Sequence, residues 1–367
     1  MKAVIAVKPA DPAVIECVDD VPMPVIDDYS ALVKVKSCGI CSSTDTKLAH
    51  GEHPDMPRPP RAPAFPHAPF PTILGHESTG EIVELGKKVK YYKPGDRVVN
   101  PFGGFGPPNP DGPHPKYSNS YGAMVEYAVA MDYRAMKEDG IAHPMMNFFT
   151  EEIDFMTKVF PKDIDFVDAA MILTFKENYS GLRNFGVKPG MDILIFGDGS
   201  ISLGLSIFLK QLKVNSIVIV GHHDQRLERI RKISDPGLLI NSKKDKLEDA
   251  LGDKKFDLAI DAAGSLDVAR QASWYLKPGG ASKVCIYGVL PKDKTVLNLY
   301  EVANNISIHI QSYPYHENRT HDEIVAFMQK GIINAKDFYD CVLPCEQAAE
   351  AFRKIETREA FKAILTF

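Results

Sequence analysis

A buried strand, a tight turn and a helix follow one another in Ile193-Leu-Ile-Phe-Gly197-Asp-Gly199-Ser-Ile-Ser202-Leu-Gly204. Gly197 permits the sharp bend, and Gly199 allows a ligand to approach the backbone. The N-terminus of the following helix directs N–H groups and partial positive charge at the same place. We therefore expect Gly197, Gly199, Ser200 and Ile201 to bind the pyrophosphate of a dinucleotide, although Ser202 replaces the third glycine of the GxGxxG pattern.

The sequence around this turn continues the same pattern. From about residue 163 onward, apolar strands alternate with amphipathic helices, which is typical of a parallel sheet covered on both faces. We expect strands at 192–196, 216–220, 256–260 and 283–288, and helices at 202–213, 225–233 and 267–276. A helix at 322–330, a strand near Val342, a helix at 346–355 and a strand at 363–367 are expected to follow. The fold class is α/β, with a doubly wound parallel sheet.

The first part of the chain has a different composition. Of 27 prolines, eight lie between Pro54 and Pro71 and six between Pro101 and Pro115, and such windows predict loops. Short alternating runs such as 31–36 and 81–84 predict half-buried strands. This part is expected to be mostly β.

The second strand of the α/β region should end beside the adenosine ribose. An acidic residue there would bind the 2′-hydroxyl of NAD, but the strand ends at Gly221, and His222, His223 and Arg226 follow. These side chains favour the 2′-phosphate of NADP. In the alternative interpretation the two histidines are solvated and Asp224 still holds NAD.

Candidate metal ligands lie in the β-rich part, in Ser37-Cys-Gly-Ile-Cys41-Ser-Ser-Thr-Asp45 and Leu74-Gly-His76-Glu77-Ser-Thr-Gly80. A lone cysteine is usually a small buried apolar residue, and a lone histidine usually a hydrogen-bonded one. Together, however, the thiolate of Cys41, the imidazole of His76 and the carboxylate of Glu77 suit zinc.

These motifs resemble a known family. The sequence GIC followed by hydroxyl residues, then GHE-x-x-G-x-I-V-x-x-G and a later GDRV, is similar to the zinc-dependent alcohol and polyol dehydrogenases of the medium-chain dehydrogenase/reductase superfamily. The resemblance runs from the initial MKAV through residues 75–86, 95–98, 122–129 and 187–190 to residues 346–365.

The resemblance implies a GroES-like, mostly β catalytic domain, residues 1–160 completed by 311–367, and a Rossmann cofactor domain, residues 161–310. It implies that Cys41 and His76 are catalytic zinc ligands and that Glu77 is a ligand or exchanges with bound water. Ser43 matches the residue that relays the substrate proton. Thr44 occupies the place of a frequent carboxylate partner of the histidine, with Asp45 one position further on.

The sequence departs from the family pattern at two places. The cysteine-rich lobe that holds a structural zinc in the family has no cysteine here between residues 99 and 121, so one catalytic zinc and no structural zinc are expected. The third protein ligand should lie near residues 170–174, where Leu173 or Thr174 aligns. Glu177, one helical turn beyond Leu173, could reach the metal, contact substrate or form an ion pair.

The resemblance implies hydride transfer between a nicotinamide cofactor and an alcohol or ketone, with a polyol, sugar or secondary alcohol as substrate. A zinc-free quinone or enone reductase of the same superfamily is one alternative, and a non-catalytic NAD(P)-binding protein is another. Substrate selection is expected to depend on three segments, 52–70, 102–121 and 131–160. Their polar residues could bind hydroxyls or a carboxylate; they are His53, Arg58, Arg61, His67 and Lys116. Their apolar residues could line a pocket; they are Phe65, Phe70, Met145, Met146 and Phe148. In the alternative interpretation, favoured at any single position, these residues only pack the long loops.

Composition excludes other classes of partner. The formal net charge is −5 and no long basic run is present, so nucleic acid is not an expected partner. No stretch approaches the roughly 20 apolar residues of a membrane helix, and the start lacks the order of a signal peptide, so a cytoplasmic location is expected. The six cysteines are too few for a disulfide framework. A homo-oligomer, implied by the resemblance, would use residues 299–310 as an edge.

Overall fold

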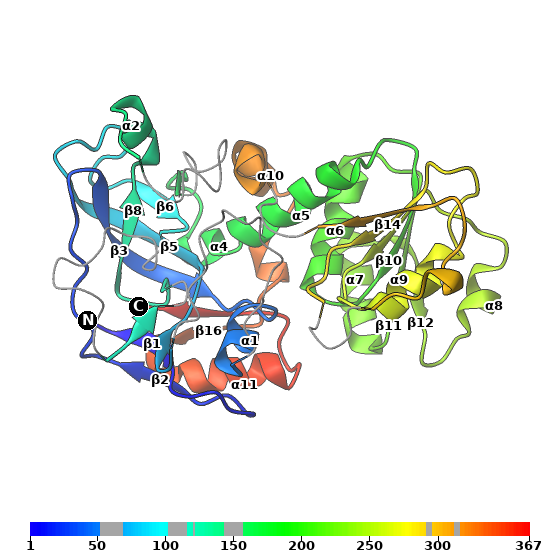
Figure 1. The fold of residues 1–367 in the computed structure, drawn as a ribbon, viewed down its shortest axis with the longest axis horizontal. Coiled ribbons are helices and arrows are strands. Elements are labelled where there is room, and N and C mark those ends of the chain that lie inside the picture. The colour runs from blue at the N-terminus through cyan, green and yellow to red at the C-terminus, as the bar shows by residue number, and fades with distance from the viewer. Residues whose placement is uncertain (52–68, 102–115, 120–121, 143–156, 291–295, 312–315) are drawn as a thin grey trace. The chain divides into compact units, whose positions relative to one another are not determined.

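The computed structural model describes residues 1–51, 69–101, 116–119, 122–142, 157–290, 296–311 and 316–367, and it divides the chain into two compact units (Figure 1). Unit 1 comprises Met1–Thr174 and His321–Phe367, and unit 2 comprises Phe175–Thr320. Both boundaries lie further along the chain than the sequence suggested.

Local packing explains where the two boundaries fall. The first shift arises because helix α4 (Phe166–Ala169) contacts the sheet of unit 1, and the carbonyl of Phe166 accepts hydrogen bonds from Ser37 and Thr79. The second shift arises because the segment before residue 321 is bonded to helix α5 (Ile172–Phe185), where Lys176 Nζ donates to Asn318 Oδ1 at 2.9 Å.

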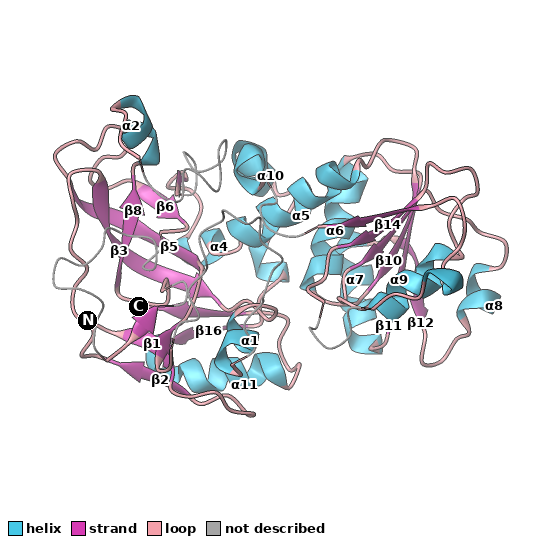
Figure 2. Ribbon diagram, viewed as in Figure 1, coloured by secondary structure: helices cyan, strands magenta, loops and turns pink. Residues whose placement is uncertain are grey.

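Unit 1 is built mainly from strands (Figure 2). Its strands are β1 Ala3–Ala6, β2 Ile15–Val18, β3 Ser30–Gly39, β4 Thr72–Ile73, β5 Glu77–Leu85, β6 Arg97–Val99, β7 Ser118–Asn119, β8 Tyr127–Met131, β9 Lys158–Val159, β16 Cys341–Pro344 and β17 Ala363–Thr366. Its helices, besides α4, are α1 Asp45–Ala49, α2 Tyr133–Glu138, α10 His321–Gln329 and α11 Ala348–Glu356, with 3-10 turns η4 Ala335–Asp337 and η5 Cys345–Gln347.

Two sheets organise the described part of unit 1. One has the order β2-β1-β4-β7, and the other runs β16-β17-β3-β5-β6-β9 with β8 paired to β3. Strand β3 lies in the middle of the larger sheet and alternates buried and half-buried residues, as expected for a strand with one face on a core. The C-terminal strand β17 pairs directly with β3, so the end of the chain completes the sheet that begins near the N-terminus.

Unit 2 contains a parallel sheet in the order β12-β11-β10-β13-β14-β15, the order of a doubly wound dinucleotide-binding fold. The strands are β10 Asp192–Phe196, β11 Ser216–Gly221, β12 Gly237–Asn241, β13 Leu258–Asp261, β14 Lys283–Ile286 and β15 Ser307–Ile310. The helices are α6 Ser200–Gln211, α7 Asp224–Ser234, α8 Leu247–Leu251 and α9 Leu266–Ser273, with 3-10 turns η2 Leu299–Glu301 and η3 Glu317–Thr320.

Helices cover both faces of this sheet (Figure 2). Helices α8 and α9 pack on the face that carries Leu194 and Val218. Helix α6 contacts α7, and it meets α5 where Phe208 packs edge-on against Phe175. The expected GroES-like and Rossmann fold is therefore confirmed. In the described part of the chain no helix has the length and apolar character needed to cross a membrane.

Candidate metal and nucleotide sites

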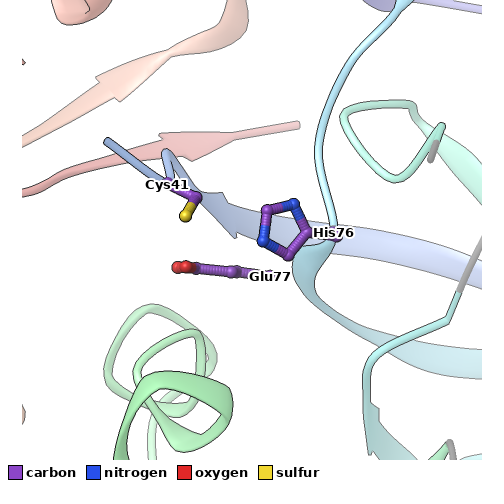
Figure 3. Close-up of side chains that lie close together, drawn as sticks. All are labelled: Cys41, His76 and Glu77. Atoms are coloured by element: carbon purple, nitrogen blue, oxygen red, sulfur yellow. The ribbon is translucent and has the colours of Figure 1, made fainter. Parts of the chain in front are cut away.

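Strand pairing in unit 1 brings the candidate metal ligands together. Cys41 follows the end of β3, Glu77 is the first residue of β5, and the two strands are antiparallel with Gly39 opposite Glu77. His76 precedes Glu77 directly. The ligand atoms of Cys41, His76 and Glu77 lie within 4.8 Å of one another, and Figure 3 shows the side chains converging from the two segments.

Asp45 is the partner of the candidate histidine ligand. Its side chain is fully buried, its Oδ1 lies 3.2 Å from His76 Nδ1, and its Oδ2 accepts a hydrogen bond from the backbone N–H of Cys41 at 2.8 Å. Since Nδ1 is engaged by Asp45, Nε2 is the ring nitrogen that would ligate a metal. Thr44, in the position expected for this partner, makes no side-chain cap bond to α1.

The electrostatic environment of Cys41 and His76 favours a charged thiolate on Cys41 and a charged imidazolium on His76. Burial acts to raise the pKa of Cys41, but the hydrogen bond and charge of His76 outweigh it, and the pKa lies below its usual value. Burial likewise acts to lower the pKa of His76, but Asp45 and Cys41 outweigh it and hold that pKa well above its usual value. A cysteine that ionises this readily is prepared for metal ligation.

Lys362 is the residue of this site that sequence reasoning missed. It precedes β17, its side chain is 6% exposed, and its ammonium forms an ion pair with the Glu77 carboxylate, which is 3% exposed. The same ammonium donates to Thr174 Oγ1 at 3.0 Å. Thr174 is one of the two residues, with Leu173, that the resemblance aligns with the family's third ligand, and in the structure its hydroxyl is bound by this lysine. Nothing in the sequence near the motifs points to Lys362.

The other two expected residues have different positions. Ser43 Oγ lies 3.3 Å from Cys41 Sγ, next to the candidate ligands. Glu177 is half-buried on α5, belongs to unit 2, and is not a member of the cluster formed by Cys41, His76 and Glu77. Its role as a ligand stays a prediction.

The glycine turn in unit 2 has the backbone geometry that the motif predicts. Gly197 has a φ of 126°, a conformation that favours glycine, and no atom lies within 4 Å of the place where a Cβ of Gly199 would be. Ser200 and Ile201 form the start of α6, two residues earlier than expected, so their N–H groups belong to the first turn of the helix.

An acidic group does stand at the end of β11, but it comes from the glycine turn. The Asp198 carboxylate accepts hydrogen bonds from the backbone N–H groups of His222 at 2.7 Å and His223 at 2.8 Å, and His223 Nδ1 lies 3.0 Å away. A Cβ at Gly221 would lie 2.6 Å from Asp198 Cβ, so the aspartate fills the space of the absent side chain. Arg226 approaches the same carboxylate at 4.0 Å.

These contacts stabilise the ionised form of the Asp198 carboxylate. Burial acts to raise its pKa, but the hydrogen bonds from His222 and His223 outweigh it, and the pKa lies below its usual value. Asp224, the acid of the alternative interpretation, is engaged elsewhere, because its carboxylate accepts from Asn241 at 2.6 Å and pairs with Lys244 at 2.5 Å.

Most of the expected substrate-contacting residues lie outside the described residues. This holds for His53, Arg58, Arg61, Phe65, His67, Met145, Met146 and Phe148. Lys116 is described and pairs with Asp20 at 2.5 Å, and Phe70 packs against the core of unit 1.

The donor set fits zinc. A thiolate, an imidazole and a carboxylate lie close together, and a buried aspartate orients the imidazole, as zinc sites in proteins require.

Comparison with known proteins identifies the family of the chain. The family model of the alcohol dehydrogenase GroES-like domain matches residues 27–140, and that of the zinc-binding dehydrogenase matches residues 238–361. Sorbitol dehydrogenase of Bacillus subtilis is 24% identical over 342 residues, which cover 92% of this chain and 89% of the relative.

Solved structures show the same fold. A zinc-binding dehydrogenase from Sinorhizobium meliloti 1021 bound to NADP has a TM-score of 0.76 at 19% identity and covers 100% of this chain and 99% of its own. An alcohol dehydrogenase from Escherichia coli CFT073 complexed with NADH has a TM-score of 0.76 at 20% identity, with the same coverage. The chain belongs to the zinc-type alcohol and polyol dehydrogenases of the medium-chain dehydrogenase/reductase superfamily.

Proposed function

We propose that this protein transfers a hydride between NADP(H) and a polyol, sugar or secondary alcohol. The observation that carries the proposal is the convergence of Cys41, His76 and Glu77, with the Ser43 hydroxyl 3.3 Å from the Cys41 sulfur. The similarity to sorbitol dehydrogenase supports a polyol within this range of substrates.

The residues of the site have separate roles in this proposal. Cys41, His76 and Glu77 would hold zinc, which lowers the pKa of a substrate hydroxyl and polarises the carbonyl in the reverse direction. Ser43 takes the proton of the substrate hydroxyl and passes it toward solvent. Asp45 fixes the ring of His76 so that Nε2 stays directed at the ligand position.

We propose a single zinc ion with Glu77 as third protein ligand. Lys362 holds the Glu77 carboxylate in place through their ion pair. A bound zinc ion would itself balance the charges of the thiolate and the carboxylate. Glu177 is the alternative third ligand. Comparing Glu77→Gln with Glu177→Gln by elemental analysis separates the two, because only the true ligand's variant loses zinc.

NADP(H) is the proposed cofactor because cationic and imidazole groups gather where the ribose should lie. His222 is held by Ser242, whose Oγ lies 2.9 Å from its Nδ1, and His223 and Arg226 are held by Asp198. Neither nearby acid is free for a ribose hydroxyl, because Asp224 is engaged by Asn241 and Lys244 and the Asp198 carboxylate accepts the N–H groups of His222 and His223. The fold itself accommodates both cofactors, since similar structures carry NADP in one case and NADH in the other.

We further propose a homo-oligomer that uses the edge of the unit 2 sheet. Strand β15 pairs with β14 on one side, and in the described residues no strand pairs with its other side. Ile310, the last residue of β15, is 62% exposed, and Tyr300, in η2, is 99% exposed. An exposed apolar edge strand is a template for pairing with a second copy. Light scattering on the wild type and Ile310→Lys tests this, and a monomeric wild type would contradict it.

The central experiment combines metal analysis with a substrate panel. The protein is purified without chelator, its zinc is measured, and NADP⁺-dependent oxidation is followed with sorbitol, other polyols, aldoses and secondary alcohols. We expect about one zinc per chain and activity that chelation removes and zinc restores. Zinc-independent reduction of a quinone or enone would instead establish the zinc-free reductase, and NADPH binding without turnover of any compound would establish a non-catalytic protein.

A further inference from the structure

Two thiols distant in sequence lie in contact on unit 1. Cys17, on β2, and Cys345, in η5, have their sulfur atoms 3.4 Å apart although 328 positions separate them in the chain. Both are free cysteines, and neither is a member of the candidate metal cluster. The contact joins the N-terminal hairpin β1–β2 to the segment that leads into α11.

The cysteine nearest to Cys345 in sequence, Cys341, is not positioned to form a disulfide with it. Cys341 lies four residues earlier, at the start of β16. A strand advances about 3.3 Å per residue, so the Cα atoms of Cys341 and of Pro344, the last residue of β16, lie about 10 Å apart. A disulfide requires Cα atoms within about 7 Å, so Cys17 is the suitable partner.

The two thiols differ in access. Cys345 is 1% exposed and belongs to the core that includes Leu74 and Phe352. Cys17 is half-buried and packs on the outside of the same core. An oxidant therefore reaches Cys17 first, and Cys345 is the neighbouring thiol that can then attack the Cys17 sulfur and expel the oxidant's thiolate.

Burial also makes both thiols slow to react. It raises the pKa of Cys17 and raises the pKa of Cys345 to about 12, where the contact with Cys17 acts in the same direction. At neutral pH the pair is therefore protonated, and only sustained exposure to an oxidant converts it.

We propose that Cys17 and Cys345 are an oxidisable pair that forms an intramolecular disulfide in the presence of a low-molecular-weight disulfide. The Cys17 thiolate attacks one sulfur of oxidised glutathione, forms a mixed disulfide and releases one glutathione thiolate. The Cys345 thiolate then attacks the Cys17 sulfur and expels the second. Both cysteines are oxidised, and the two protons they lose end on two molecules of reduced glutathione.

The bond would close a loop that contains almost the whole chain. It constrains the unfolded state and ties the N-terminal hairpin to the C-terminal segment, so the folded protein becomes more resistant to heat. The C-terminal segment also carries Lys362 and β17, so the bond secures the part of the chain that completes the candidate metal site.

Peptide mapping of the zinc-loaded full-length protein tests the proposal. After incubation with oxidised glutathione and alkylation of the remaining thiols, a digest without reductant should contain a peptide that links Cys17 to Cys345, lighter by two hydrogens than the reduced pair. The midpoint of thermal unfolding should rise by about 5 °C and return with dithiothreitol.

Matched variants decide the outcome. Cys17→Ser, and Cys17→Ala should the serine disturb the strand, must lose both the linked peptide and the thermal shift. Cys341→Ser must keep them, since Cys341 is a half-buried thiol of the same segment whose pKa burial also raises. Glutathione left on Cys17 without the link, a link to another cysteine, or no reaction at all would overturn the proposal.

Discussion

The residues of the candidate metal site lie far apart in the sequence, whereas those of the candidate nucleotide site lie close together. The metal site joins a residue after β3, two at the start of β5 and a lysine before β17, which meet because the three strands are neighbours in one sheet. The nucleotide site uses one turn and the end of the next strand of a parallel sheet. The comparison teaches that the first site depends on the whole sheet, whereas the second depends on local geometry.

Removing a zinc ligand should have the largest effect, because the metal site has few members and each is placed by distant contacts. We expect Cys41→Ala to lose its zinc and to lower kcat/KM for alcohol oxidation by about 1000-fold or more. Elemental analysis and steady-state kinetics measure the two effects, with Cys341→Ser as the cysteine control. Retention of zinc in Cys41→Ala would remove Cys41 from the ligand set.

Removing the proposed proton relay, Ser43, should have the second-largest effect on activity. Ser43→Ala should slow oxidation at neutral pH by about 100-fold, because the substrate hydroxyl then loses its proton directly to solvent. The deficit should shrink as pH rises and hydroxide becomes more abundant. Ser42→Ala, at an exposed neighbouring position, is the control. A deficit that stays constant with pH would contradict the relay role.

Substitution of Asp45, the partner of His76, tests how strongly zinc affinity depends on the orientation of the His76 ring. Asp45→Asn keeps the shape of the side chain but loses its charge, and we expect a loss of about 10-fold to 100-fold in zinc affinity. Thr44→Val, at the neighbouring position, should change affinity little because Thr44 makes no side-chain cap bond. Competition with a chromogenic chelator compares the two variants. Equal losses in both would show that Asp45 does not act through His76.

The smallest effect is expected at the nucleotide site, where several groups share the recognition. Arg226→Gln should raise the KM for NADP⁺ by about 10-fold and leave the KM for NAD⁺ nearly unchanged, because only the former carries a 2′-phosphate. Arg229→Gln, also on α7, is the control. A larger rise for NAD⁺ than for NADP⁺ would reverse the proposed cofactor preference.

Much of the fold could be predicted because its elements are encoded by local periodicity. The strand at 192–196 and the glycine turn are found as expected, and the helices near 225–233 and 322–330 differ from α7 and α10 by one residue at each end. The expected unit boundaries lie earlier in the chain than the observed ones, because the packing of α4 and of η3 is not visible in the sequence.

The candidate site was less accessible to sequence reasoning. Cys41, His76 and Glu77 could be named from their motifs, whereas Lys362 lies far along the chain and reaches Glu77 only through the pairing of β17 with β3. The sequence shows Asp198 only as part of the glycine turn, because its contact with His222 and His223 depends on the pairing of β10 with β11. Asp45 and Thr44 could be distinguished only by the direction of the side chain at the start of α1.

The close approach of Asp198 to Gly221 limits the order in which mutations can be accepted. An acid introduced at position 221 to favour NAD would collide with Asp198, whose Cβ and Oδ2 lie 2.6 and 2.7 Å from the new Cβ. A smaller residue at position 198 must therefore come first, and on its own it leaves the N–H groups of His222 and His223 without their acceptor. We expect each single change to be unfavourable and the double change to be better tolerated than either, so the effects of the two substitutions should not be additive.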